Sequence, residues 1–256
     1  MKTICFACQK GGTAKTVTAF TVATALYNKG YRILCVDTDQ QSNFSLSAGI
    51  DILNQNNTLF NVFKGDCTPQ EAITHAKLGF DFITGGLLMA AADSVFSAET
   101  AKEFMLKDIL EEMQENFDFC IIDTSPHLGL GTINALTAAD YLIIPVTADL
   151  YALQGLVSLK NIINSLKKRC NPDLVVSGLL ITRYREQYKA NQKLKSDIEK
   201  AATLFNTKVF NTTIREAVAV KNALNNGTDL FTNSPKEKVT EDYSNFVSEL
   251  LKELEV

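Results

Sequence analysis

The chain has 256 residues, of which 46% are hydrophobic, so it is long enough to bury a sizeable core. No apolar run reaches the roughly 18 residues that a membrane span needs, and the N-terminal segment leads directly into a Gly-rich loop rather than a cleavage site. These features argue against an integral membrane protein and a secreted one. We expect a cytoplasmic protein that forms a single domain over residues 1–256.

The net charge of -4 conceals an uneven distribution of charge. Residues 1–154 carry 9 Lys and Arg against 17 Asp and Glu, and residues 222–256 carry 3 against 7. Residues 155–221 carry 13 against 5, so a basic segment lies between two acidic ones. Such a segment predicts that one face binds a polyanion, although a solvated helical face is the plain alternative.

Short apolar segments alternate with helical patterns along the chain. The expected strands are Lys2–Cys8, Tyr31–Asp37, Phe80–Thr84, Phe117–Asp123, Tyr141–Val146 and Leu174–Ile181. The expected helices are Val17–Asn28, which Gly30 ends, then 101–115, 151–169 and a last one from about Lys236. This alternation predicts an α/β fold in three layers, with a mostly parallel sheet and helices on both faces. Ligands of such sheets bind at the carboxyl ends of the strands.

The six cysteines are scattered, and we expect them to be reduced residues that pack as small hydrophobes. Cys5 and Cys8 form a C-x-x-C pattern. We place both in one strand, where residues three positions apart lie on opposite faces. Core packing is therefore favoured over a zinc or redox site.

The segment Gln9–Thr16 (QKGGTAKT) lies between the first strand and the first helix, where a phosphate loop belongs. Backbone N–H groups at a helix N-terminus converge on an anion, and glycines allow a close approach. We expect Lys15 to neutralise β- and γ-phosphate oxygens and the Thr16 hydroxyl to bind Mg²⁺. The segment departs from G-x-x-x-x-G-K-[ST] at Gln9 and Ala14. The predicted nucleotide-binding residues are Lys10, Gly11, Gly12, Thr13, Ala14, Lys15, Thr16 and Val17.

The pattern K-G-G-x-x-K-T, with Lys10 as its early lysine, resembles the deviant phosphate loop of the ParA and MinD group. This resemblance implies a P-loop NTPase fold that binds ATP and Mg²⁺. It also implies that Lys10 reaches across a homodimer to the partner's nucleotide, where it is a catalytic cation supplied in trans, while Lys15 is the catalytic lysine of its own subunit.

The second strand ends in Asp37–Asn43 (DTDQQSN), which resembles the D-x-D-P-Q-G-N of the same family. The resemblance implies that Asp37 is a carboxylate of the magnesium site and that Asp39 positions the attacking water. The alternative is that the two carboxylates cap the next helix.

Residues 117–155 resemble ParA proteins closely and continuously. An apolar strand that delivers Asp123 to its carboxyl end is the Walker B arrangement, in which the carboxylate holds magnesium through water. The Pro- and Gly-bearing segment Thr124–Gly131 is expected to be a switch that moves when the γ-phosphate leaves. We expect His127, within it, to be solvated or capping, without a catalytic role.

The last third resembles the family more loosely, through Gly178–Tyr184 and Thr213–Gly227. In the family this stretch lies beside the adenine and supplies basic residues that contact DNA. Cations spaced along helices with few aromatic residues are typical of phosphate contacts rather than base stacking. The predicted DNA-binding residues are Lys189, Lys193, Lys195, Arg215 and Lys221.

Taken together, the resemblance implies a partition ATPase for a plasmid or chromosome. Mg-ATP would drive dimerisation and nonspecific binding to double-stranded DNA on the nucleoid, and hydrolysis to ADP and phosphate, stimulated by a ParB-like or small centromere-binding protein, would release it. Since Ala14 restricts the loop, we expect slow turnover, below about 1 s⁻¹. The alternatives are a MinD-like membrane-associated regulatory ATPase, an iron–sulfur ATPase, a metabolic synthetase of the same fold, and a DNA-binding protein with a decayed loop.

Overall fold

The computed structural model describes the whole chain except residues 148–151 and 186–188, and of residues 152–154, 189–194 and 225 it describes only the backbone. Within the described residues seven strands form one sheet, and each adjacent pair is parallel except the antiparallel pair at one edge. The prediction of a mostly parallel sheet is therefore confirmed. In spatial order the strands are β3 (Ile73–His75), β4 (Asp81–Ile83), β2 (Ile33–Asp37), β5 (Phe119–Asp123), β1 (Lys2–Phe6), β6 (Tyr141–Thr147) and β7 (Val175–Thr182).

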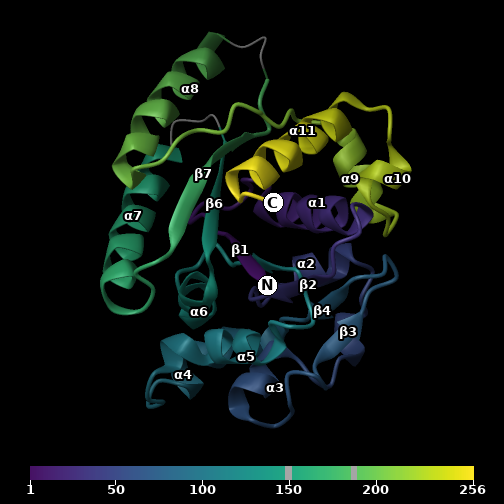
Figure 1. Ribbon diagram of the computed structural model, residues 1–256, viewed down its shortest axis with the longest axis vertical. Coiled ribbons are helices and arrows are strands. Elements are labelled where there is room, and N and C mark those ends of the chain that lie inside the picture. The colour runs from purple at the N-terminus through teal and green to yellow at the C-terminus, as the bar shows by residue number, and fades with distance from the viewer. Residues whose placement is uncertain (148–151, 186–188) are drawn as a thin grey trace.

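Helices cover both faces of the sheet, as predicted (Figure 1). Alternate strand residues separate into two cores, so that Ile4 and Ile121 face one layer while Cys5 and Ile122 face the other. The first layer holds α1 (Lys15–Asn28), α2 (Asn43–Ser47) and α11 (Lys238–Glu253); the second holds α3 (Leu59–Lys64), α5 (Met105–Met113), α6 (Leu130–Ala138), α7 (Ala152–Arg169) and α8 (Lys189–Ala202).

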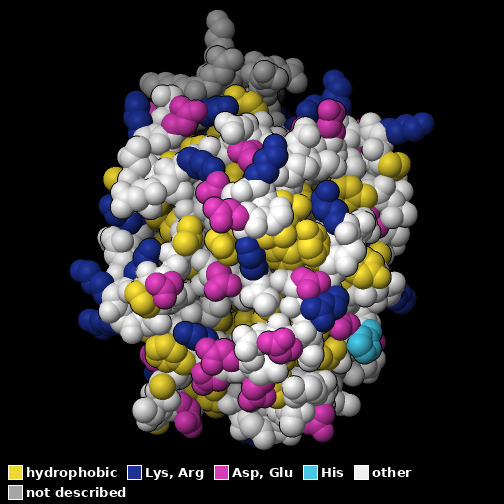
Figure 2. Space-filling view, in the orientation of Figure 1, with side chains coloured by type: hydrophobic (Ala, Val, Ile, Leu, Met, Phe, Trp, Pro, Cys, Tyr) yellow, Lys and Arg dark blue, Asp and Glu magenta, His cyan; other side chains and the backbone are white. Residues whose placement is uncertain are grey.

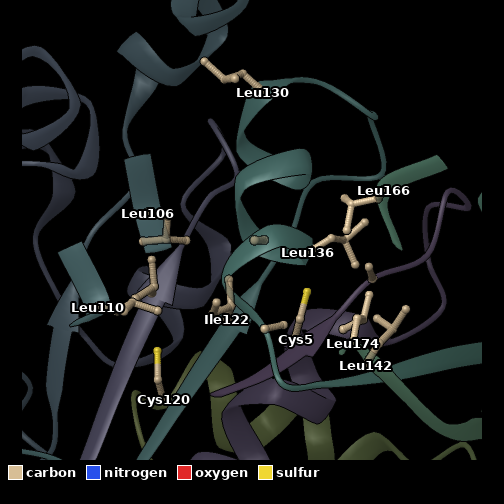
Figure 3. Packing of buried hydrophobic residues seen from close by; sticks show 14 of the residues in the cluster. Cys5, Leu106, Leu110, Cys120, Ile122, Leu130, Leu136, Leu142, Leu166 and Leu174 are labelled. Carbon is tan, nitrogen blue, oxygen red and sulfur yellow. The ribbon is translucent and has the colours of Figure 1, made fainter. Parts of the chain in front are cut away.

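Figure 3 shows part of the second core, where the side chains of two helices meet those of the central strands. Leu106 and Leu110 of α5 and Leu136 of α6 lie over Ile122 of β5, and all four are at most 4% exposed. A buried asparagine, Asn134 of α6, ties these helices together, because its Oδ1 accepts from Leu106 N at 2.9 Å. One face of the central strands is thus packed against α5 and α6.

The strand ends that carry the expected chemistry lie level with one another. Phe6, Asp37 and Asp123 are paired across β1, β5 and β2. The Thr124 hydroxyl donates to Phe6 O at 2.9 Å, and the Thr38 hydroxyl donates to Asp123 O at 3.0 Å. The carboxyl ends of three neighbouring strands therefore meet at one place.

Two details differ from the expectations drawn from the sequence. β1 ends at Phe6, so Cys8 lies beyond the strand, and the expectation that Cys5 and Cys8 occupy opposite faces of one strand is wrong. Both are nevertheless buried, and all six cysteines are free. The edge strand β3 was not expected, because its three residues carry no apolar pattern; two are partly buried and His75 is exposed.

The remaining helices are short or peripheral. They are α4 (Ala92–Val95), α9 (Val218–Asn225) and α10 (Leu230–Asn233). Among the described residues, none of the helices combines the length and the apolar character needed to cross a bilayer.

Candidate nucleotide-binding site

A cavity of about 450 Å³ opens at the carboxyl end of the sheet. The eight predicted nucleotide-binding residues, Lys10 through Val17, all line it, together with Asp39. Its other walls are residues that were not predicted individually to bind nucleotide, although three of them lie in segments that resemble the family. These other walls are Asn43, Leu46 and Ser47 of α2, Pro126 of the switch segment and Leu224 of α9.

The phosphate loop presents unpaired backbone donors. Within the described part of the chain, the N–H groups of Gly11 through Val17 have no hydrogen-bond acceptor, and the last three of these residues begin the 14-residue helix α1. Gly12 and Ala14 both adopt left-handed backbone angles, with φ of 77° and 57°. A loop that leaves its amides unsatisfied at the N-terminus of a helix is suited to bind an anion.

Lys15, Thr16 and Asp123 form a compact cluster beneath this loop. The Lys15 Nζ lies 3.7 Å from Asp123 Oδ1, and these side chains are 6% and 1% exposed. The Thr16 hydroxyl donates to Asp123 Oδ2 at 2.7 Å, whereas Oδ1 has no hydrogen-bond partner among the described residues. Burial raises the pKa of Asp123, and the Lys15 ammonium opposes that rise. A carboxylate with an unsatisfied oxygen beside a hydroxyl fits the oxygen ligands that Mg²⁺ prefers.

Asp37 and Asp39 occupy different surroundings. Asp39 lines the cavity, and its Oδ1 accepts from Gln41 N at 3.0 Å. Asp37 is completely buried outside the cavity, where its Oδ2 accepts from both Ser45 N and Ser45 Oγ at 2.9 Å. Asp37 therefore caps the first turn of α2, which is the alternative that the sequence left open, while remaining level with Asp123 in the adjacent strand.

Burial, and then the negative charge of Asp123, raises the pKa of Asp37 from 3.8 to about 7. Between these values the folded chain holds a proton that the unfolded chain has lost, so stability falls as the pH rises. We therefore compare the wild type with Asp37→Asn, both without Mg²⁺ and nucleotide. Between pH 5 and 7 the free energy of unfolding of the wild type should fall more steeply than that of Asp37→Asn, by up to about 1.4 kcal/mol per pH unit. Urea titrations of both proteins at several pH values measure this difference, and a difference that is independent of pH would contradict it.

Ala14 holds a backbone conformation that normally belongs to glycine, since the left-handed region costs a residue with a Cβ atom about 1 kcal/mol or more. We expect Ala14→Gly to stabilise the apo protein by about 0.5–1 kcal/mol, after the greater freedom of glycine in the unfolded chain is deducted. Ala48→Gly, in the buried right-handed turn after α2, should destabilise it and serves as the control. Chemical denaturation tests the prediction, and a less stable Ala14→Gly protein would refute it.

Lys10 and the switch segment border both this cavity and a neighbouring open hollow. The Lys10 Nζ donates to Thr147 Oγ1 at 3.4 Å, at the end of β6. Lys10 also lines the second hollow, together with Pro126, His127 and Leu128. His127 is exposed, and its backbone rather than its ring holds the turn, because its N–H bonds Ser125 Oγ and its carbonyl accepts from Thr132.

The predicted DNA-binding residues whose side chains the structure describes differ in their surroundings. Arg215 binds the Asp242 carboxylate through its Nε at 2.6 Å and its Nη2 at 2.7 Å, which joins it to α11. Lys195 of α8 is partly exposed and Lys221 of α9 is exposed, whereas the side chains of Lys189 and Lys193 lie outside the described residues. In Figure 2, acidic side chains gather over the lower part of this face, where α3 to α5 lie, and basic ones lie along its left edge and upper part, near α7 and α8.

The comparisons with known proteins agree with this geometry. The AAA domain family matches residues 1–176. Soj, the sporulation initiation inhibitor protein of Bacillus subtilis, is 31% identical over 250 residues, which cover 97% of this chain and 98% of Soj. The chromosome partitioning protein ParA of Caulobacter vibrioides is 30% identical over 226 residues, which cover 87% and 84%.

The chain belongs to the ParA/Soj-type P-loop ATPases. Two solved structures share its fold. Cobyrinic acid a,c-diamide synthase from Mycobacterium smegmatis, with a bound ATP analogue and magnesium, has a TM-score of 0.88 and 28% identity over 98% of this chain and 94% of its own. A variant of Cyanothece McdA in complex with ATP has a TM-score of 0.86 and 25% identity over 98% and 96%. These ligands agree with the ATP and Mg²⁺ predicted for a ParA/Soj-type chain.

Proposed function

We propose that this chain is a partition ATPase that binds Mg-ATP in the cavity beside the phosphate loop. One observation carries the proposal: the row of acceptor-free N–H groups in Gly11–Val17, over the buried cluster of Lys15, Thr16 and Asp123. The names of the relatives, which include chromosome partitioning protein ParA, support the cellular role.

The residues divide the work of hydrolysis. The N–H groups and Lys15 bind the β- and γ-phosphates, and Asp39, at the rim of the cavity, orients the attacking water. Thr16 and Asp123 hold Mg²⁺, which neutralises the charge that develops on the phosphate oxygens. Asp37 lies outside the cavity, level with Asp123 in the adjacent strand, so in our proposal it supports the metal-holding carboxylate without contacting the nucleotide.

The position of Lys10 supports the proposed dimerisation. This residue lies where the nucleotide cavity meets the hollow beside the switch segment, so a short movement away from Thr147 would bring its ammonium to a facing subunit. In our proposal Lys10 binds the partner's γ-phosphate and completes the site in trans. Loss of that phosphate then releases both Lys10 and the switch segment.

The dimer would bind DNA through the phosphates. Lys168 and Arg169 are exposed in the last turn of α7, and Lys195 and Lys221 extend the charge across α8 and α9. Arg215 contributes chiefly by fixing its segment to α11. If six phosphates are neutralised, the slope of log K against log[salt] is about -5. The proposed activator of hydrolysis is a ParB-like or small centromere-binding protein. The proposed location is the cytoplasm, in association with the nucleoid.

The decisive experiment is a gel-shift on nonspecific duplex DNA with ATP, with ADP and without nucleotide, for the wild type and for Lys10→Ala. Binding should require ATP and should weaken at least tenfold in Lys10→Ala, because linked contacts from two subunits raise the avidity. Lys77→Ala, an exposed lysine next to the β3–β4 edge, is the matched control. Binding that ignores both nucleotide and Lys10 would refute the switch, and a salt slope near zero would refute phosphate contacts.

The structure and the comparisons bear on two alternative functions. A MinD-like membrane role needs a free amphipathic helix, but Val239, Phe246 and Leu250 of α11 are buried against the core beside α1. A synthetase role is favoured by the resemblance to the Mycobacterium smegmatis enzyme. ATP-dependent DNA binding would distinguish a partition ATPase from a MinD-like membrane protein and from a synthetase.

A further inference from the structure

The exit of β7 contacts the phosphate loop through two consecutive residues. The Thr182 hydroxyl is fully buried and lies 2.9 Å from Thr13 O and 3.2 Å from Val146 O. The Arg183 Nη1 donates to Gly12 O at 3.2 Å. Two neighbouring carbonyls of the loop are thereby drawn toward the same strand end.

These contacts set the direction of two peptide groups. In a trans peptide the C=O and the following N–H point in opposite directions, so turning Gly12 O toward Arg183 turns Thr13 N–H away from it. In the same way, Thr182 orients the N–H of Ala14. Both amides belong to the row without acceptors, and Ala14 has a left-handed backbone that its surroundings must enforce.

A carboxylate braces Arg183. Glu216 accepts from the Arg183 Nε at 3.2 Å and Nη2 at 2.6 Å, and also from the Arg185 Nε at 2.7 Å. Its own segment is fixed to β7, because Ile214 N donates to Ile181 O and Tyr184 N donates to Ile214 O. Arg183 and Arg185 lower the pKa of Glu216, so its carboxylate stays negatively charged.

We propose that Thr182 and Arg183 are positioning residues that preset the Thr13 and Ala14 N–H donors for the phosphates of ATP, with Glu216 holding Arg183 in place. This inference rests on the proposed binding of Mg-ATP. A glycine at position 14 would adopt the left-handed backbone without support. In this chain, side chains at the exit of β7 hold the loop instead, although Thr182 lies 169 residues from Thr13 in the sequence.

The test compares two matched pairs of variants. Thr182→Val removes the hydroxyl, whereas Thr182→Ser retains it. Arg183→Met removes the guanidinium, whereas Arg183→Lys keeps one donor for Gly12 O. Arg32→Met is the control, since Arg32 forms a comparable exposed pair with Asp118 at the opposite end of the sheet. The ligands are Mg-ATP, tripolyphosphate and adenosine, and the readouts are Kd and the melting temperature without ligand.

We expect Thr182→Val and Arg183→Met each to raise the Kd of Mg-ATP and of tripolyphosphate about tenfold and to leave adenosine unchanged. Thr182→Ser should restore binding, Arg183→Lys should restore it in part, and the melting temperatures without ligand should change little. The inference would be overturned if the variants lost affinity only for adenosine. It would also be overturned if lower melting temperatures without ligand explained the whole loss of phosphate binding. If the wild type binds Mg-ATP and all variants bind equally, only the inference fails; if the wild type binds neither phosphate ligand, the proposed function fails with it.

Discussion

Lys15→Met should raise the Kd of Mg-ATP at least 100-fold. The Lys15 ammonium lies at the start of α1, 3.7 Å from the buried Asp123 carboxylate, so it balances that charge and would balance the phosphates. Without it, the triphosphate would meet an uncompensated carboxylate in a site with little water. Charge-assisted hydrogen bonds contribute about 1.5–3 kcal/mol each, which corresponds to roughly 10- to 150-fold in affinity before repulsion is added.

Isothermal titration calorimetry with Mg-ATP measures this effect. Lys29→Met is the matched control, because Lys29 is an exposed lysine at the other end of the same helix. We expect the control to bind as the wild type does. A Kd for Lys15→Met within threefold of the wild type would mean that the phosphates do not lie at this loop.

Asp123→Asn should slow hydrolysis by about 1000-fold and abolish its dependence on Mg²⁺, because removal of a metal-holding carboxylate forfeits several kcal/mol of transition-state stabilisation. ATP binding should persist, since the substitution removes a negative charge beside the phosphates. The substitution should also lower the pKa of Asp37, whose pKa the charge of Asp123 helps to raise. Folding should therefore be retained or improved near neutral pH.

Single-turnover hydrolysis, followed across a Mg²⁺ titration, tests this prediction independently of slow product release. Asp118→Asn provides the control, because Asp118 precedes the same strand but pairs with Arg32 at the opposite end of the sheet. Hydrolysis by Asp123→Asn within tenfold of the wild type, with an unchanged Mg²⁺ dependence, would remove Asp123 from the metal site.

The local parts of the site were predictable because they depend on neighbours in the sequence. An apolar strand, a glycine-bearing loop and a helix follow one another in residues 2–28, and this order alone places Lys15 and Thr16 at a helix N-terminus. Asp123 was predictable for the same reason, since it ends an apolar strand. The sheet itself followed from the alternation of such strands with helices.

The hydrogen-bond and ion-pair partners of several polar side chains could not be predicted, because those partners come from distant segments of the chain. No sequence pattern showed that Ser45 donates two hydrogen bonds to the carboxylate of Asp37, whose place at the magnesium site stays a prediction. Arg215 was predicted to bind DNA from the basic segment and the family resemblance, and only the folded chain shows that its guanidinium donates to Asp242. Similarly, Asp93 of α4 accepts from Leu130 N at the start of α6, across 37 residues.

The amino-acid sequence alone therefore specified the parallel strands of the sheet, the phosphate loop and the Walker B aspartate, since local periodicity and backbone geometry encode them. The tertiary structure decided which charges are paired and which stay exposed, and it joined the exit of β7 to the phosphate loop. The physical reason is that hydrogen bonds and ion pairs act over a few ångströms in space. Only the folded chain brings residues such as Gly12 and Arg183 within that range.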